Sequence, residues 1–238
     1  GVGAFNYAYG TEVPILADAN DFYHFDRWTG TAVDGGMVTD PNDETTTITV
    51  LGECTLVANF ALNSLVAVVD ANLDTNPGWG TSGQWTFGVP TGLGGALYGY
   101  PDPTSGNTGT NVYGVNLSGD YSTAIGGPHY LTAGPFNLTG KWQTQLEFES
   151  WLNSDTADYV IHVLQISFDG GSSWTTLWQQ SGHRDIVSNS WSLSSYDISA
   201  LADNKSNVYV RWGYSITSNA YPYSGWNIDD IKILGRQK

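Results

Sequence analysis

The sequence has few basic residues and a single cysteine. Among its 238 residues, 8 are Lys or Arg and 23 are Asp or Glu, which gives a formal net charge of −15 at pH 7. This charge argues against nucleic acid and anionic membrane surfaces as partners, because both would repel the chain. The single cysteine, Cys54, allows no internal disulfide, and we expect it to be a small buried or edge hydrophobic residue.

The sequence also lacks long hydrophobic runs. No stretch is apolar for long enough to cross a membrane, so we expect no membrane insertion, and we find no signal peptide or lipidation motif. The chain does not start with Met, which indicates a piece of a longer protein with covalently linked neighbouring domains. Any targeting signal would then lie outside the piece.

Helical periodicity is absent as well. No long segment places apolar residues at positions i, i+3, i+4 and i+7, the spacing of an amphipathic helix. The chain is instead rich in Gly, Thr, Ser, Asn and aromatic residues, which is typical of an all-β protein whose short strands are joined by turns. With 40% hydrophobic residues, the chain can bury a core in one or two domains.

Residues 1–62 form a first expected domain with several strand-like segments. These segments are Val2–Tyr9, Glu12–Ala17, Tyr23–Trp28, Thr45–Leu51 and Thr55–Leu62. An acidic loop from Asp34 to Glu44 lies among them. A solvated loop is the favoured interpretation of this charge, and a cation site is the alternative.

Motifs of this domain resemble the divergent internalin-type B-repeat of bacterial surface and secreted proteins. The motifs are Gly10 to Val13, Ala17-Asp18, Phe22 to Gly30, Thr47 to Val50 and the ending Thr55 to Phe60 with its Ala-Asn-Phe. The resemblance implies a small β-grasp-like spacer domain without catalytic residues. The acidic loop is a departure from the repeat pattern.

Residues 63–238 form a second expected domain. Its strand-like segments alternate with turns, and Asp169-Gly170-Gly171 is a strong hairpin signal. Segment 90–111 is so rich in Gly, Pro, Ser and Asn that we expect a long loop, which is usually functional or held by a bound group. Residues 198–203 are the one expected helical turn. The pattern predicts a β-sandwich of jelly-roll type.

The stretch from Gly225 to Leu234 is predicted to be the closing strand. With strict alternation, Asp230 shares a face with Trp226, and Asp229 shares the opposite face with Ile231. At least one of the two carboxylates must then face a covered layer, where it needs a partner. Because Lys and Arg are scarce, we predict a hard cation such as Ca²⁺, and a solvated strand-end turn is the alternative.

The second domain carries motifs that point to a known kind of module. They are Trp85 to Pro90, Pro101 to Leu117, Gly119-Asp120-Tyr121, Ser167 to Trp174, Tyr196 to Ser199 and Gly225 to Ile231. Across residues 65–235 the sequence resembles the MAM-like jelly-roll modules of large bacterial extracellular proteins, which are similar in architecture to carbohydrate-binding modules. The resemblance implies a secreted or cell-surface location and structural calcium.

The resemblance places the calcium site near the turn from Gly106 to Asn111. The ligands that it implies are Asp102, Asn107, Asn111, Asp229 and Asp230. The chemistry is consistent, because Ca²⁺ binds about six to eight oxygen atoms from carboxylates, Asn side chains and backbone carbonyls. The alternative is that Asp102 and Asn107 only stabilise consecutive turns.

Sugar binding requires aromatic rings that stack on the C–H faces of pyranoses, with polar groups beside them. The candidate ligand-binding residues are Tyr98, Tyr100, Trp178, Arg184, Tyr221 and Tyr223. Ordinary loop packing is the alternative for each tyrosine. Five tryptophans lie in fold motifs and are expected in the core: Trp79, Trp85, Trp174, Trp212 and Trp226.

Two glutamates could indicate an enzymatic function. Glu147 and Glu149 lie two positions apart in a strand-like segment, so both project to one face, as catalytic carboxylates do in some jelly-roll glycosidases. The segment departs from the laminarinase-like pattern, because Phe148 replaces the middle acid. The four His residues show no metalloprotease spacing, and His162 is expected in the core. We predict no enzymatic activity, with a jelly-roll glycoside hydrolase as an alternative.

The predicted function is non-catalytic recognition of a polysaccharide or glycan by an accessory module of a secreted or cell-surface bacterial protein. The module is expected to be monomeric and stabilised by Ca²⁺. Its affinity is expected to be weak and to gain from linkage to other modules. The other alternative is a structural or protein-adhesive spacer without a sugar site.

Overall fold

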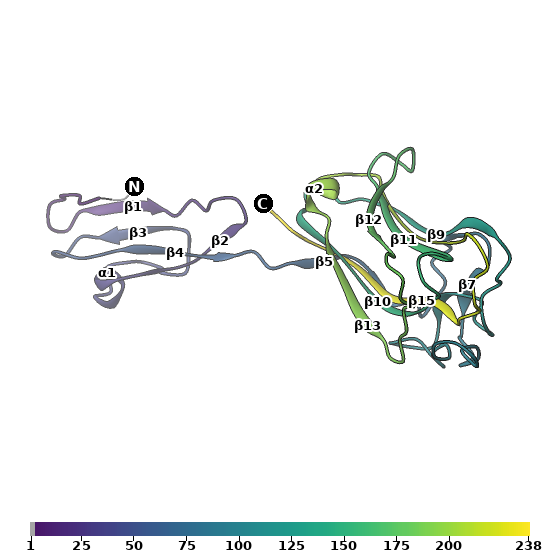
Figure 1. The fold of residues 1–238 in the computed structure, drawn as a ribbon. Coiled ribbons are helices and arrows are strands. Elements are labelled where there is room, and N and C mark those ends of the chain that lie inside the picture. Colours follow the sequence, from purple (N-terminus) through teal and green to yellow (C-terminus); the bar gives the residue numbers. More distant parts are fainter. Residues whose placement is uncertain (1–2) are drawn as a thin grey trace. The chain divides into compact units, whose positions relative to one another are not determined.

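The computed structural model describes residues 3–238, which form two compact units (Figure 1). The first unit contains the chain up to Ser64 together with the last three residues, Arg236 to Lys238. The second unit runs from Leu65 to Gly235. The boundary expected from the sequence lies after residue 62, and the return of the last three residues to the first unit was not foreseen. Apart from two short helices, the regular elements of both units are all strands, so the predicted all-β class is confirmed.

The first unit is built from two antiparallel strand pairs and one helical turn. Strand β1 (Glu12–Leu16) pairs with β3 (Thr45–Thr49), β2 (Tyr23–Thr29) pairs with β4 (Val57–Leu62), and α1 (Thr31–Asp34) follows β2. Val13 of β1 lies opposite Ile48 of β3, and both pack around Ala32 in a small core. Cys54 is a free, half-buried residue against this core, as predicted.

The strand expected over Val2–Tyr9 is wrong for residues 3–9, which form no strand, while Val2 lies outside the described residues. The alternating aromatic side chains of this segment suggested a strand. A strand also needs a neighbour to accept and donate its backbone hydrogen bonds, and within residues 3–238 no strand pairs with this segment. Phe5 and Tyr9 are accordingly exposed.

The acidic loop of the first unit forms exposed turns. The carboxylate of Asp40 accepts a hydrogen bond from the backbone N–H of Asn42 at 2.8 Å, and that of Asp43 accepts one from Thr45 at 2.9 Å. These are the local bonds by which Asp stabilises turns. The interpretation of this segment as a solvated loop is therefore confirmed for Asp40 and Asp43.

The second unit is a sandwich of two sheets, which confirms the predicted jelly-roll class. The first, called here the β10 sheet, has the order β13-β10-β15-β8-β7, and β5 also pairs with β15. Its strands are β5 (Val66–Ala71), β7 (Trp85–Gly88), β8 (Val112–Val115), β10 (Trp142–Asn153), β13 (Ser192–Asp197) and β15 (Gly225–Arg236). The second, the β14 sheet, has the order β12-β11-β14-β9-β6. Its strands are β6 (Gly80–Thr81), β9 (Gly126–Phe136), β11 (Val160–Ser167), β12 (Thr175–Gln179) and β14 (Val208–Ile216).

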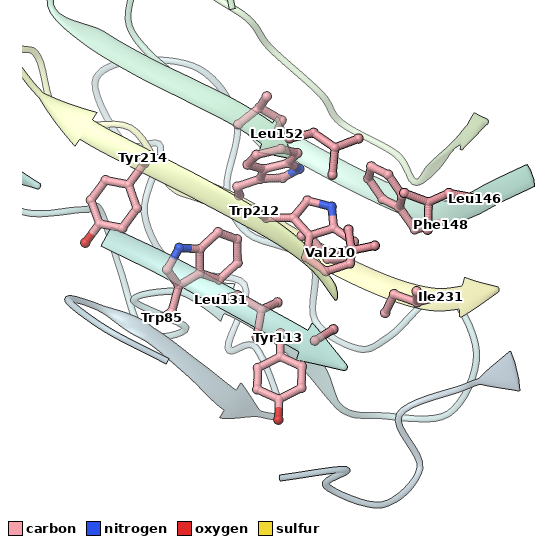
Figure 2. Close-up of a cluster of buried hydrophobic side chains, with 14 of the residues drawn as sticks. Trp85, Tyr113, Leu131, Leu146, Phe148, Leu152, Val210, Trp212, Tyr214 and Ile231 are labelled. Carbon is pink, nitrogen blue, oxygen red and sulfur yellow. The ribbon is translucent and has the colours of Figure 1, made fainter. Parts of the chain in front are cut away.

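The core of the second unit lies between the two sheets (Figure 2). Because side chains alternate along a strand, Leu146 and Phe148 point inward from β10, and Val210 and Trp212 point inward from β14. The rings of Phe148 and Trp212 meet edge to face, with centroids 5.4 Å apart. Removal of this apolar surface from water is the main favourable term in folding.

Most of the residues predicted to be in the core are there. Trp85, Trp212 and Trp226 are buried, and so is His162. Trp79 and Trp174 are half-buried, so they sit at the margin of the packed region. The core prediction is therefore confirmed for three of these five tryptophans and for the histidine.

Local structure in the second unit also follows the sequence signals. The hairpin predicted at Asp169-Gly170-Gly171 joins β11 to β12, and α2 (Ser199–Ala202) is the predicted helical turn. Segment 90–111 contains no strand or helix, as expected for a long loop. No helix within residues 3–238 has the length and apolar character needed to cross a membrane.

The closing strand β15 breaks the strict alternation expected for it. Ile228 and Ile231 are three positions apart, yet both are fully buried in the core. Between them Asp230 adopts a left-handed backbone conformation with φ of 48°, which adds one residue to the strand and resets the alternation. The expectation that Asp229 and Asp230 point to opposite faces is therefore wrong, because both carboxylates accept hydrogen bonds from Thr108.

Candidate functional site

The outer face of the β10 sheet carries a row of polar and aromatic side chains. Since Leu146, Phe148 and Leu152 of β10 are in the core, Glu147, Glu149 and Trp151 point to the outside. The antiparallel register pairs each of these with a residue on or next to β13. The cross-strand pairs are Glu147 with Ser195 and Glu149 with Leu193, and the next position along brings Trp191 beside Trp151.

The two tryptophans of this row are in contact. The ring centroids of Trp151 and Trp191 lie 5.9 Å apart with an interplanar angle of 71°, and both side chains are half-buried. The Nε1–H of Trp151 donates a hydrogen bond to the carbonyl oxygen of Pro101 at 3.1 Å. The loop that contains Tyr100 and Pro101 therefore borders the aromatic end of the row, and Tyr100 is 45% exposed there.

The acidic part of the row opens into a groove of about 350 Å³. The groove is lined by Asn107, Thr108, Glu147, Glu149, Leu193, Asp230 and Lys232. Leu193 is 60% exposed and offers apolar surface among groups that donate and accept hydrogen bonds. This combination suits a ligand with many hydroxyl groups and small apolar faces.

The electrostatics of the groove are negative. Partial burial raises the pKa of Glu149, and the neighbouring charge of Asp230 raises it further. Lys232 lies 3.8 Å from the carboxylate of Asp70, a pair that is open to solvent and contributes little to stability. The groove as a whole therefore disfavours anionic ligands.

The loop tyrosines predicted from the sequence are brought together by the structure. The rings of Tyr98 and Tyr221 stack with centroids 4.5 Å apart, and Tyr223 lies 5.7 Å from Tyr98. Tyr221 is 53% exposed, whereas Tyr223 is buried and donates a hydrogen bond to Asp185. Tyr221 is thus the exposed ring of the stack, and it packs on Tyr98, which in turn lies next to Tyr223.

The remaining two predicted ligand-binding residues lie apart from this stack. Trp178 is half-buried at the margin of the core, where its ring meets that of Trp226 at 5.7 Å. Arg184 is exposed in the segment between β12 and β13. Next to it, His183 lies 2.7 Å from the carboxylate of Asp158, whose hydrogen bond raises the pKa of the imidazole.

Backbone and carboxylate oxygen atoms converge around Gly106 in the loop that faces β15. A Cβ at this position would lie 2.6 Å from Asp229 Oδ2 and 2.9 Å from the carbonyl oxygen of Asn111, and it would also collide with the carbonyl oxygen of Thr108. Asp229 is fully buried, and its Oδ1 has no hydrogen-bond partner within the described part of the chain. We call these oxygens of Thr108, Asn111 and Asp229 the oxygen cradle.

The oxygen atoms of the cradle are of the kinds that could hold a hard cation. Residues 3–238 contain no cluster of three or more His, Cys, Asp or Glu side chains able to hold a metal, so a site here depends on backbone carbonyls. Ca²⁺ accepts such carbonyl oxygens together with a carboxylate. Burial raises the pKa of Asp229 to about 6, against the lowering effect of the backbone N–H groups of Asp230, Thr108 and Asn107, and a positive ion beside the carboxylate would compensate the buried charge.

The five predicted metal ligands do not all meet at the cradle. Asn111 contributes its backbone carbonyl, while its side chain donates to the carbonyl of Asp74. The side-chain amide of Asn107 donates to Asp230 Oδ2 at 2.8 Å, so its nitrogen faces that carboxylate. Asp102 is elsewhere on this face of β15, where it accepts a hydrogen bond from Asn227 at 2.6 Å.

The pair formed by Asp102 and Asn227 has two buried oxygen atoms without hydrogen-bond partners among residues 3–238, namely Asp102 Oδ2 and Asn227 Oδ1. Burial raises the pKa of Asp102 to about 8, and the charge of Asp120 adds to the effect. A proton on Asp102 would let the carboxyl group donate to the amide oxygen. The chemistry of this pair is therefore that of an acid and an amide rather than of an ion pair.

Several residues of the row and the groove were not predicted from the sequence. The position of Trp151 could have been predicted, because strand alternation places it on the same face as Glu149. The positions of Trp191 and Leu193 could not, because they depend on the register between β10 and β13. Thr108 is recognised only once the loop is seen folded against Asp229 and Asp230.

Comparison with known families identifies the first unit. Residues 2–64 match the model of the divergent InlB B-repeat domain, which confirms the resemblance predicted for this part of the chain. A curated relative, bacillopeptidase F of Bacillus subtilis, is 28% identical over 176 residues. That similarity covers 71% of this chain and spans 11% of the length of the relative.

Solved structures similar to this chain include a xylan-binding domain, a protein of a xyloglucan utilization locus and an adhesin domain. A xylan-binding CBM22 domain from Paenibacillus barcinonensis has 10% identity and a TM-score of 0.44, covering 75% of this chain and 99% of that one. A protein of a xyloglucan utilization locus in Bacteroides uniformis has 15% identity and a TM-score of 0.44, covering 95% and 69%. A cleaved adhesin domain of Lys-gingipain from Porphyromonas gingivalis has 12% identity and a TM-score of 0.41, covering 71% and 99%.

Proposed function

We propose that the second unit is a non-catalytic polysaccharide-binding module, carried by a secreted or cell-surface bacterial protein of several domains. The observation that supports it most directly is the continuous outward row on β10 and β13. This row joins the Trp151 and Trp191 rings to a groove lined by carboxylates, an amide and a hydroxyl group. Rings next to convergent polar groups are what a pyranose needs, because its C–H faces stack and its hydroxyl groups donate and accept hydrogen bonds.

Each part of the row has a role in this proposal. Trp151 and Trp191 supply ring surface, Glu147 and Glu149 accept hydrogen bonds from sugar hydroxyls, and Asn107 orients a neighbouring hydroxyl. The negative groove favours neutral chains over polyuronates, because an anionic sugar would meet like charge without compensation.

The loop tyrosines extend the same binding surface. Tyr100 borders the tryptophan pair through Pro101, and the exposed ring of Tyr221 offers a further stacking position supported by Tyr98. Tyr223 supports this surface, since it is buried next to Tyr98, whereas Trp178 packs on Trp226 at the margin of the core. Arg184 is exposed between β12 and β13 and is the candidate there for contact with a sugar hydroxyl.

Calcium belongs to this proposal as a structural ion. Asp229 and the carbonyl oxygens of Thr108 and Asn111 would hold it, with Asp230 and Asn107 in the adjoining shell. When bound, Ca²⁺ supplies positive charge that neutralises the buried carboxylate and fixes the long loop. Asp102 would influence the site only through Asn227 on β15.

In this proposal the acids of the groove bind sugar hydroxyls and do not cleave the chain. Glu147 and Glu149 project from one strand into the groove, and Phe148 between them, where the laminarinase-like pattern has a third acid, lies in the core. Asp230 also lines the groove and accepts hydrogen bonds from Thr108 and Asn107.

The test is a binding screen against insoluble polysaccharides and soluble oligosaccharides at saturating Ca²⁺, with released reducing sugar measured in the same samples. Trp151→Ala should weaken binding by about tenfold or more, as expected for removal of a stacking ring. Trp174→Ala is the matched control, because Trp174 is also half-buried but stacks on Arg211 at the β14 sheet. Equal losses in both variants, or release of sugar, would contradict the proposal.

A structural or protein-adhesive spacer is the second candidate. Residues 2–64 match the divergent InlB B-repeat domain, and the resemblance to such repeats implies a spacer domain. Of the ten tryptophans, four are buried and six half-buried, so ring surface is limited to partly covered positions. Absence of binding to cellulose, xylan, mannan, pectin and algal polymers would favour this candidate.

A further inference from the structure

Residues 106–111 contribute to both the oxygen cradle and the groove. We propose that this segment couples the two, so that a divalent cation in the cradle strengthens polysaccharide binding in the groove through Thr108 and Asn107. The inference rests on the proposed function and adds its regulation. The coupling follows from the contacts of residues 106–111, which face the oxygen cradle on one side and the groove on the other.

On the cradle side, Thr108 is fixed through its backbone. Its N–H donates to Asp229 Oδ2 at 3.1 Å, and its carbonyl oxygen is one of the cradle oxygens around Gly106. The carbonyl of Asn111 and the buried carboxylate of Asp229 complete the set. Without a cation these oxygens repel one another, whereas a bound cation draws them together.

On the groove side, the same residue acts through its side chain. The Thr108 hydroxyl donates to Asp230 Oδ1 at 2.5 Å, and the Asn107 amide donates to Asp230 Oδ2 at 2.8 Å. Asp230, Thr108 and Asn107 all line the groove beside Glu149. Movement of the loop therefore changes the position of the Asp230 carboxylate and of two further lining groups.

Strand β15 makes this connection direct. The left-handed conformation of Asp230 places its carboxylate on the same side as that of Asp229, so one turn of loop reaches both. A cation that fixes Thr108 thus fixes the groove wall before any sugar arrives. Such pre-ordering lowers the cost of binding, and the linkage is reciprocal, so a bound sugar must raise cation affinity by the same factor.

The first experiment uses Ca²⁺ alone as the probe. CaCl₂ is titrated into the full chain, and the ¹³C shifts of the side-chain carboxyl groups of Asp229, Asp230 and Glu149 are followed by NMR. In the unaltered protein all three should shift with one midpoint. In Thr108→Val, Asp229 should shift as before and Asp230 and Glu149 should shift less, because the cradle carbonyl and N–H remain while one of the two loop hydrogen bonds to Asp230 is lost.

Two further variants distinguish the effect of the Thr108 hydroxyl group from general effects of a substitution in this loop. Thr108→Ser keeps the hydroxyl and should restore the shifts of Asp230 and Glu149. Thr110→Val changes an exposed threonine of the same loop and should behave as the unaltered protein. If Asp230 and Glu149 do not respond to Ca²⁺ in the unaltered protein, or respond equally in Thr108→Val, the coupling is refuted.

The second experiment measures binding of xylohexaose, cellohexaose and chitohexaose by calorimetry, in Ca²⁺ and after chelation. We expect chelation to weaken binding by about 5- to 150-fold in the unaltered protein, the usual range of such linkage, and by a smaller factor in Thr108→Val, where only the Asn107 bond to Asp230 remains. Equal affinity with and without Ca²⁺ would overturn the inference and leave the proposed function intact. Loss of all binding even in Ca²⁺, with the NMR response present, would refute the proposed function and leave the coupling of loop and groove standing.

Discussion

His162 shows how one buried polar side chain is accommodated in this sandwich. It is fully enclosed, its ring lies 5.5 Å from that of Trp226, and its Nδ1 lies 3.0 Å from Gln180 Oε1. Because Gln180 Oε1 is an acceptor, Nδ1 carries the proton of a neutral imidazole. Burial lowers the pKa of His162 to about 4, since the charged form would lose its hydration.

This predicts an acid-sensitive contribution to stability. The folded-state pKa of His162 lies below the ordinary value of 6.5, so its contribution is present above pH 6.5 and is lost as the pH falls through about 4. The loss amounts to about 3 kcal/mol in the free energy of unfolding. Urea unfolding of the unaltered protein and His162→Gln at pH 7 and pH 4 should show this difference, and His24→Gln, at an exposed position, should not.

The acid and amide pair of Asp102 and Asn227 predicts the opposite pH dependence. The folded-state pKa of Asp102 is raised from 3.8 to about 8, so its contribution to stability is full below pH 3.8 and is lost as the pH rises through about 8. In Asp102→Asn an amide N–H replaces the proton, and the decline between pH 6 and 9 should become shallower. Urea unfolding with chelator present measures it, and parallel curves for both proteins would refute the protonated pair.

At the scale of elements, the loop over β15 is tied to the sheet by oxygen atoms that leave no room for a side chain. Gly106→Ala places a methyl group among the cradle oxygens, with Asp229 Oδ2 at 2.6 Å. We expect at least tenfold weaker Ca²⁺ binding by calorimetry, because the methyl group would push the cradle oxygens out of position. Gly80→Ala is the control, since a Cβ there meets open space, and it should bind as the unaltered protein does.

The outer face of the β14 sheet gives a second prediction at this scale. The guanidinium of Arg211 lies 3.9 Å from the ring centroids of both Tyr130 and Trp174, so one cation joins β9, β14 and the start of β12. Arg211→Lys keeps the charge and loses the planar stack. It should lower the free energy of unfolding by about 1 kcal/mol. Arg184→Lys, at an exposed position, is expected to leave stability unchanged.

Strand patterns were predictable from the sequence where burial alone decides them. The alternation in β10 and β14 is visible in residues such as Leu146, Phe148, Val210 and Trp212, because one face of each strand meets the core. The two faces of β15 were assigned wrongly, since a single left-handed residue, Asp230, shifts the alternation and leaves no hydrophobic signal.

The candidate site was predictable only in part. Acidic and amide residues in a Gly-rich loop indicated where oxygen ligands gather, and the tyrosines Tyr98 and Tyr221 were recognised as loop residues. The groove depends on pairing between segments more than forty positions apart, such as Glu149 with Leu193. Such pairing is a property of strand register, which a single sequence does not reveal.

At the scale of the whole molecule, the chain forms two compact units, and its last three residues belong to the first. Arg236 donates a hydrogen bond to the backbone carbonyl of Asn63, and the side-chain amide of Asn63 donates one to the backbone carbonyl of Gln237 at 3.1 Å. Lys238 forms a salt bridge with Asp21 at 2.9 Å. The last three residues therefore complete the first unit. Removal of residues 236–238 should lower the melting temperature of the first unit in calorimetry and leave the transition of the second unchanged.

The return of the chain to the first unit has a mechanical consequence. Tension applied between the first unit and Lys238 passes through the bonds at Asn63 and Gln237 and leaves the sandwich unloaded. Once those bonds break, force reaches β5 and β15 at the same end, where Val66 lies opposite Gly235. When two strands are pulled apart from one end, their hydrogen bonds break one residue pair after another. The sandwich should therefore unfold at low force in an optical trap, because its hydrogen bonds are not loaded together in shear.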